Sequence, residues 1–370
     1  SEIINALGEV GYPHALGYLK YIVENNDSSE LRELARESIK KIDPAAIKLP
    51  AAQLFYMLAE NYYYHAKSLE PALEASFANV WFWDLETSRL IRKEVDMSYF
   101  YELMAMRSCE LALKADSSFG KAIGLWIASF FKAESAGIEM PGYFGLNHAA
   151  ASVYATTAGP EYLHQALARS LRDENSYVAL GAVEALAVTA GEKSLFYSYG
   201  PAQPLMQALT FEDKSVKYSA AIAVSAGGPK REFNESHYVI ENLSEALSGD
   251  VKSGYPWRAV NAMLKLARTN NPVIDLSKGQ NALIGAIDEK PDSIKVIAAE
   301  VLAHLKSPQA QRAIAEMALN DRLEIDVRVS AFGSLALSAK LNTNLLESQK
   351  VDQIYSLVSS LEINNELRSA

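Results

Sequence analysis

The sequence predicts an all-α chain: a superhelical stack of two-helix repeats with one short β-hairpin inserted. Three observations support this prediction. A helix–turn–helix pattern recurs from residue 160 onward, a block between residues 50 and 140 breaks its period, and one stretch of that block has the composition of two short strands. The chain has 370 residues, of which 49% are apolar and 22% charged. This composition is typical of a folded chain with a sizeable core.

Each repeat has an apolar anchor that ends the first helix, a polar turn with an Asp, and a small residue within the second helix. The anchors are Leu171, Leu209, Leu247, Ile287 and Leu319. The matching small residues, eleven or twelve positions further on, are Ala182, Ala220, Ala259, Ala298 and Ala331. A further copy at the N-terminus pairs Val23 with Ala35. A two-helix unit cannot bury its apolar stripe alone, so we expect the units to stack, with Ala where helices approach and the turn Asp capping the second helix.

Two of the second helices carry a pattern that can be compared with known repeat families. The stretches from Asp213 to Ala223 and from Asp326 to Leu335 resemble the "Asp, Val-Arg, Ala, Ala-Leu" core of HEAT repeats, and are similar to the short repeats of bilin-lyase-like bacterial proteins. The resemblance covers residues 1–43 and about 145–340. It implies a HEAT/armadillo-like α-solenoid and is nearly silent on activity.

The block that interrupts the repeats resembles a different helical module. The run that starts at Ala112, turns after Asp116 and continues from Ala122 resembles the junction between tetratricopeptide units, although Ser117 stands where that family usually has proline. The chain is therefore predicted to have four segments. They are an N-terminal HEAT-like repeat (1–48), a tetratricopeptide-like module (49–142), a HEAT-repeat array (143–341) and a C-terminal helix (342–370) that we expect to be truncated.

The predicted hairpin spans residues 80–95. Two runs rich in β-branched, aromatic and long side chains flank a polar turn from Asp84 to Ser88. Because strand side chains alternate, Trp81 and Trp83 share one face. An isolated hairpin is marginal in water, so we expect it to lie on the helices. In the favoured interpretation both tryptophans pack against the solenoid, and in the alternative they anchor a partner protein.

Basic residues recur at equivalent positions near the start of successive second helices. They are Lys217, Arg258, Lys295 and Arg328. In the favoured interpretation each cation bonds the turn Asp of its own or a neighbouring unit and so fixes the stacking. In the alternative, the four form a cationic stripe on the concave face that binds an acidic partner. The long polar loop 227–237, with Lys230 and Arg231, is a second candidate contact site.

Signatures of catalysis are not found in the sequence. The chain has six histidines and one cysteine. No histidine is followed by Glu, and there is no zinc-protease, P-loop, nucleophile-elbow or C-x-x-C motif. We therefore predict no catalytic, cofactor-binding or metal-ligating residue. Cys109 lies in an apolar stretch and is expected to be an inert packed thiol.

The charge balance bears on the class of partner. The net charge is −10, which argues against nucleic acid, because nucleic-acid binders neutralise phosphates with a basic surplus. No apolar run approaches the roughly 18 residues of a membrane helix, and no targeting segment is visible. We expect a soluble cytoplasmic or periplasmic protein without membrane insertion.

The favoured functional hypothesis is a non-enzymatic scaffold that binds protein partners through a solenoid surface. One alternative is a structural component that self-assembles through the ends of the solenoid, since exposed repeat ends invite stacking. The least favoured alternative is a HEAT-repeat enzyme, either a lyase acting on a tetrapyrrole or a base-excision glycosylase.

Overall fold

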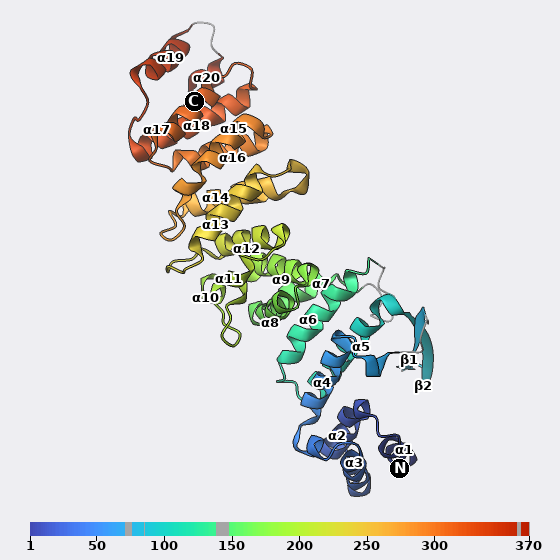
Figure 1. The fold of residues 1–370 in the computed structure, drawn as a ribbon. Coiled ribbons are helices and arrows are strands. Elements are labelled where there is room, and N and C mark those ends of the chain that lie inside the picture. Colours follow the sequence, from blue (N-terminus) through green and yellow to red (C-terminus); the bar gives the residue numbers. More distant parts are fainter. Residues whose placement is uncertain (71–75, 85, 138–147, 361–363, 370) are drawn as a thin grey trace. The chain divides into compact units, whose positions relative to one another are not determined.

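The computed structural model describes residues 1–70, 76–84, 86–137, 148–360 and 364–369. Over these residues the chain is all-α apart from one antiparallel hairpin, which confirms the predicted fold class (Figure 1). The chain divides into two compact units, Ser1–Ala185 (unit 1) and Leu186–Ala370 (unit 2).

Unit 1 is a series of packed helices with the hairpin inserted between α4 and α5. Its elements are α1 (Glu2–Val10), η1 (Pro13–Ala15), α2 (Leu16–Asn25), α3 (Ser29–Ile42), η2 (Pro44–Lys48), α4 (Ala51–Tyr63), η3 (Lys67–Leu69), β1 (Phe77–Asp84), β2 (Arg89–Asp96), α5 (Met97–Ala115), α6 (Lys121–Glu134), α7 (Ala151–Ala158), α8 (Pro160–Arg172) and the beginning of α9 (Ser176–Thr189). Helix α2 packs on α3 and α4, α4 packs on α5, and α6 packs on α5 and α8. Side-chain caps start α3 and α5. The Ser28 hydroxyl accepts a hydrogen bond from the Leu31 amide (3.3 Å), and the Asp96 carboxylate accepts one from the Ser98 amide (2.8 Å).

Unit 2 is built from helices in two layers. Its elements are α10 (Glu192–Leu195), α11 (Pro204–Ala208), α12 (Lys214–Gly227), α13 (Ser236–Ser248), η5 (Val251–Ser253), α14 (Tyr255–Arg268), η6 (Leu276–Gly279), α15 (Gln280–Glu289), α16 (Asp292–Ala303), α17 (Pro308–Leu319), α18 (Ile325–Asn342), α19 (Ser348–Ser359) and α20 (Asn365–Ser369). Helices α12, α14, α16 and α18 contact one another in that order, and α13, α15 and α17 form the second layer in the same way. Within this unit the helix pairs stack as in an α-solenoid.

The repeat pattern read from the sequence coincides with the buried positions. All six small residues, which are Ala35, Ala182, Ala220, Ala259, Ala298 and Ala331, are fully buried. Of the anchors, Leu209, Leu247 and Ile287 are buried, whereas Val23, Leu171 and Leu319 are half-buried. Helices meet most closely at the alanines, so burial is most complete there.

The predicted capping of the second helices by turn aspartates holds at α12 and fails at α9, α14, α16 and α18. The Asp213 carboxylate accepts hydrogen bonds from the Ser215 and Val216 amides (2.8 and 3.3 Å) and so caps α12. In the turn before α9 the cap is Asn175, whose side-chain oxygen accepts from the Val178 amide (3.1 Å). Asp173 bonds side chains there instead.

Two element boundaries differ from those expected. The strands cover residues 77–84 and 89–96, so the hairpin begins three residues earlier and ends one residue later than predicted. The segment after residue 342 holds two helices, α19 and α20, and not one.

Over the described ranges, none of the helices combines the length and the apolar character needed to cross a bilayer.

Candidate functional site

The hairpin presents one aromatic face to solvent. In the antiparallel register Trp81 lies opposite Arg92 and Trp83 lies opposite Leu90. The other face carries Ala78 and Val80, which are buried, and both strands contact α5. In Figure 1 the two strands lie beside α5. The helix thus supports the hairpin from one side only.

The interpretation in which both tryptophans pack against the helices is wrong. Trp81 is 56% exposed and Trp83 is 59% exposed, and Leu90 is equally open. Alternation along β1 places the small Ala78 and Val80 on the side of α5, where they allow close approach, and places the two indoles on the opposite side. Large exposed side chains of this kind, grouped on one face, are typical of a contact surface.

Arg107 of α5 lies under the hairpin. Its guanidinium carbon is 4.3 Å from the centre of the Phe82 ring, which is a cation–π contact. The Nη1 atom is buried and has no hydrogen-bond partner among the described residues. A buried guanidinium nitrogen without an acceptor is costly and requires an explanation.

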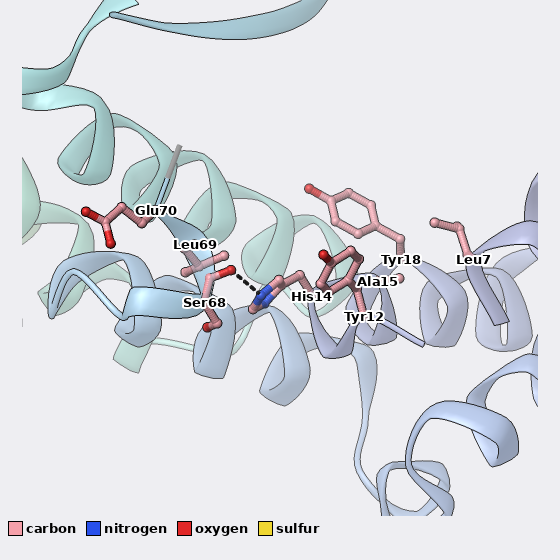
Figure 2. Close-up of a pocket in the computed structure, with 8 residues that line it drawn as sticks. All are labelled: Leu7, Tyr12, His14, Ala15, Tyr18, Ser68, Leu69 and Glu70. Carbon is pink, nitrogen blue, oxygen red and sulfur yellow. Dashed lines mark hydrogen bonds between the residues drawn. The ribbon is translucent and has the colours of Figure 1, made fainter. Parts of the chain in front are cut away.

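A pocket of about 440 Å³ opens at the start of unit 1 (Figure 2). It lies between α1, η1, α2 and η3. Its lining consists of Leu7, Tyr12, His14, Ala15, Tyr18, Ser68, Leu69 and Glu70. The His14 ring lies 3.3 Å (Nε2 to O) from the carbonyl of Ser68, which ties η1 to η3. The pocket is mainly aromatic and apolar, as ligand pockets usually are.

An ion cluster around the buried carboxylate of Glu102 on α5 joins this helix to α6 and to the residues that follow α4. The Glu102 carboxylate is 2.7 Å from Nε2 of His65 and 3.2 Å from Nζ of Lys132. Burial raises the pKa of Glu102, but the hydrogen bond from His65 and the charge of Lys132 outweigh it, so the pKa lies below its usual range. The carboxylate is therefore ionised at neutral pH, and the cluster ties α5 to α6 and to the segment that follows α4.

A second polar network joins α4 to α8. The Arg169 guanidinium donates to the Tyr56 hydroxyl (2.9 Å), the Glu60 carboxylate (2.8 Å) and the Tyr64 hydroxyl (2.7 Å). Tyr64 in turn donates to the Asp173 carboxylate (2.9 Å). Within this network the hydroxyls of Tyr56 and Tyr64 both accept from Arg169 of α8, so these two tyrosines meet a polar partner while their rings remain partly buried.

Lys217, Lys295 and Arg328 bond groups other than the carboxylates of the turn aspartates, so the favoured interpretation of a regular ladder between these groups is wrong. Lys217 bonds the Glu245 carboxylate on α13 (2.6 Å). Lys295 and Arg328 donate to backbone carbonyls near the ends of the preceding helices, those of Asp288 (3.1 Å) and Ala318 (3.0 Å). Cations at these places complement the negative ends of the helices. The guanidinium of Arg258 lies 5.3 Å from the centre of the Tyr255 ring.

The two cations of the loop 227–237, Lys230 and Arg231, also contact residues of unit 2. Lys230 forms an ion pair with Glu192 (2.9 Å), and the Arg231 guanidinium lies 4.4 Å from the centre of the Phe196 ring. The six predicted cations are thus distributed over separate local contacts within unit 2.

Groups that could support catalysis are sparse in the described part of the chain. No cluster of three or more His, Cys, Asp or Glu side chains that could hold a metal ion occurs among those residues. Cys109 is completely buried in α5, and burial raises the pKa of its thiol well above the usual range. The prediction of a packed thiol is confirmed.

Arg107 and the pocket were missed at the level of sequence. Arg107 stands alone in an apolar helix and matches no motif, while the pocket residues come from four separate elements. The signal that could have pointed to this region is the concentration of tyrosines in the first 101 residues: Tyr12, Tyr18, Tyr21, Tyr56, Tyr62, Tyr63, Tyr64, Tyr99 and Tyr101.

Comparison with known proteins identifies neither a family nor an activity for this chain. No family model matches the chain, and no curated protein matches it. Among solved structures, an engineered protein determined by a structural genomics consortium matches with 16% sequence identity and a TM-score of 0.41. That alignment covers 100% of this chain and 92% of the engineered one. Neither a family nor an activity follows from so distant a likeness.

Proposed function

We propose that this chain is a non-enzymatic scaffold of HEAT-type repeats with a tetratricopeptide-like insert, and that it binds a partner protein on the exposed face of the hairpin. The observation that carries the proposal is the exposure of Trp81 and Trp83 side by side on one face. Beside them on β2 lie Leu90 and Arg92. Tryptophan and arginine are the side chains most enriched among the residues that dominate binding energy at protein interfaces.

The support under the hairpin strengthens this proposal. A contact surface binds more tightly when it is held in its bound shape beforehand, because less conformational entropy is lost on association. Ala78 and Val80 fix the hairpin on α5, and Phe82 holds it to Arg107. The two indole rings are therefore presented on a rigid element.

The test is a double substitution, Trp81→Thr with Trp83→Thr, which keeps strand propensity while removing both rings. The wild-type chain is used to capture its partner from the native source, and the affinity of each variant for that partner is then measured. Loss of two central aromatic side chains should weaken binding by at least about 30-fold.

The matched control is Trp257→Ala on α14, because Trp257 is 54% exposed and lies far from the hairpin in sequence. It should bind as the wild type does. Equal binding by the double variant and the control, with the same circular dichroism spectrum in both, would overturn the proposal.

A second candidate function is self-assembly through the terminal helices. Large apolar side chains are exposed on α1, at Ile3 and Val10, and on α19, at Val351 and Tyr355. Stacked repeats expose an apolar surface wherever a terminal helix lacks a polar outer face. We therefore propose that copies of the chain associate through these helices.

A further inference from the structure

The pocket at the start of unit 1 is lined by aromatic rings, apolar side chains and one carboxylate. Three rings contribute, those of Tyr12, His14 and Tyr18. The ring planes of Tyr12 and His14 are nearly parallel, at 16° to each other, and their centres are 6.2 Å apart. The carboxylate belongs to Glu70, and the lining contains no Lys or Arg. Aromatic faces together with a negative charge attract a cation and disfavour an anion.

The rings that line the pocket are held by their neighbours and still reach solvent. The Ser68 carbonyl can only accept, so Nε2 of His14 donates the hydrogen bond between them (3.3 Å). The ring of Tyr18 packs edge-on against the buried Phe55, with centres 5.0 Å apart. Tyr18 is 43% exposed and Tyr12 is 62% exposed, so both offer ring surface to a ligand. A pocket that is shaped beforehand loses less entropy on binding.

The carboxylate of Glu70 is available to a ligand. It is exposed and forms no ion pair or hydrogen bond with a described residue. In Figure 2 it lies at one end of the lining, with the tyrosine rings toward the other. Burial raises the pKa of Tyr18 and the charge of Arg107 acts in the opposite direction, but Arg107 is stacked on Phe82 and does not line the pocket. The charge within the lining is therefore negative.

We propose that this pocket binds the trimethylammonium group of a small molecule, with the rings of Tyr12 and Tyr18 against its methyl groups and Glu70 balancing its charge. A primary ammonium is strongly hydrated and needs acceptors for three hydrogen atoms. The lining is largely apolar, and the Ser68 carbonyl already accepts from His14. A trimethylammonium group has no hydrogen atom to donate, and aromatic side chains are its usual recognition elements.

The size and place of the pocket bear on the ligand. Its volume of about 440 Å³ lies within the range of small-molecule sites, roughly 300–1,000 Å³. No residue of the hairpin lines it. The inference therefore stands apart from the proposed binding of a partner protein on the hairpin, and either can fail without the other.

The experiment uses the purified full chain and choline chloride as the probe, and follows binding by a titration of the choline methyl signal in NMR. The comparison ligand is the neutral tert-butyl analogue of choline, in which carbon replaces the charged nitrogen. Choline should bind the wild type. The neutral analogue should bind at least about fivefold more weakly, because the rings attract the charge as well as the methyl groups.

Substitutions in the lining test each contribution. Tyr12→Leu and Tyr18→Leu should each weaken choline binding by about 5- to 30-fold, because each removes one ring. Tyr18→Phe should keep most of the affinity, since it loses the hydroxyl and retains the ring. Glu70→Gln should weaken binding by about two- to fivefold, the modest effect of an exposed charge.

Matched controls alter the same residue types outside the pocket. Tyr177 is 49% exposed, close to the value for Tyr18, and does not line the pocket, so Tyr177→Leu should bind choline as the wild type does. Glu2→Gln removes the same charge from α1 and should also leave the affinity unchanged. If Tyr18→Leu does not fold, the more exposed Tyr12 carries the test of the rings.

Several results would overturn the inference. They are an absence of choline binding by the wild type, equal binding of choline and its neutral analogue, and unchanged affinity in the folded Tyr12→Leu variant. Tighter binding of a peptide that carries trimethyllysine than of choline would also contradict it, because the ligand would then be a modified protein side chain and not a small molecule.

Discussion

Glu245 shows how a single residue gives one of the regularly spaced cations its role. Its carboxylate lies 2.8 Å from Nζ of Lys214 and 2.6 Å from Nζ of Lys217. The hydrogen bonds from Lys214 and then Lys217 lower the pKa of Glu245 to about 2. Because Glu245 belongs to α13 and both lysines belong to α12, the triad fixes the register of one helix on the other.

This triad predicts a pH-dependent part of the stability. A carboxylate whose pKa is lowered by folding stabilises the folded state fully above its unfolded value of 4.5, and that contribution is lost as the pH falls toward about 2. The side chain is partly open to water, so screening reduces the effect to about 1 kcal/mol. Glu245→Gln should lower the free energy of unfolding by that amount at pH 6, measured by urea denaturation.

The difference between Glu245→Gln and the wild type should shrink between pH 4.5 and pH 3. Glu235→Gln, a carboxylate just before α13 with no ion pair among the described residues, is the control and should differ little from the wild type at either pH. A difference that stays constant over this range would contradict the assignment.

At the scale of residues, local pattern predicted burial well and predicted contacts poorly. The six repeat alanines were identified from spacing alone, because a helical period places one position per unit at the closest approach. The partners of Lys295 and Arg328 were missed, since backbone carbonyls at helix ends leave no trace in the sequence. Arg107 was missed for a related reason: the ring that it contacts, Phe82, lies on β1, far from it in sequence.

Among the elements, α2 and α4 pack so closely that a glycine is required between them. A Cβ atom added at Gly17 would lie 2.7 Å from Cδ1 of the buried Phe55 ring. Gly17→Ala should therefore destabilise the chain by about 1–3 kcal/mol through overpacking, measured as a lower midpoint of thermal or urea unfolding.

Gly333→Ala provides the control for this prediction. Gly333 lies inside α18, and nothing in the structure comes within 4 Å of the position a Cβ would take. Here the higher helix propensity of Ala should stabilise the chain by about 0.5–1 kcal/mol. If both substitutions shifted stability in the same direction, the close packing at Gly17 would not be the cause.

For the hairpin, the sequence predicted the two strands but not which face of them the helices cover. Its existence and turn followed from composition, and alternation correctly placed Trp81 and Trp83 on one face. The choice of face did not follow, because both faces of β1 carry apolar side chains, with Val80 and Phe82 on one and the indoles on the other. Only the tertiary contact with α5 decides which of them is covered.

Over the whole molecule, the exposed apolar residues on α1 and α19 predict concentration-dependent self-association. Sedimentation velocity at rising protein concentration should show species larger than the monomer. Ile3→Glu and Tyr355→Glu should each suppress them, since a charge at the contact opposes burial. The net charge of −10 also opposes association, so the effect should weaken at low salt.

Val188→Glu is the control for this prediction. Val188 on α9 is 78% exposed, close to the 77% of Ile3, but lies on neither terminal helix. Its substitution should leave the association unchanged. A monomer at every concentration, or suppression by all three variants alike, would argue against assembly through the terminal helices.

The buried thiol of Cys109 has a practical consequence for labelling experiments with this chain. It is the one cysteine in the sequence and is completely buried in α5. Cysteines introduced at exposed positions are therefore the thiols that a maleimide dye can reach. A dye pair, with one dye placed in each unit, would report by energy transfer how the chain responds when a partner arrives, with every native residue of the binding surfaces left in place.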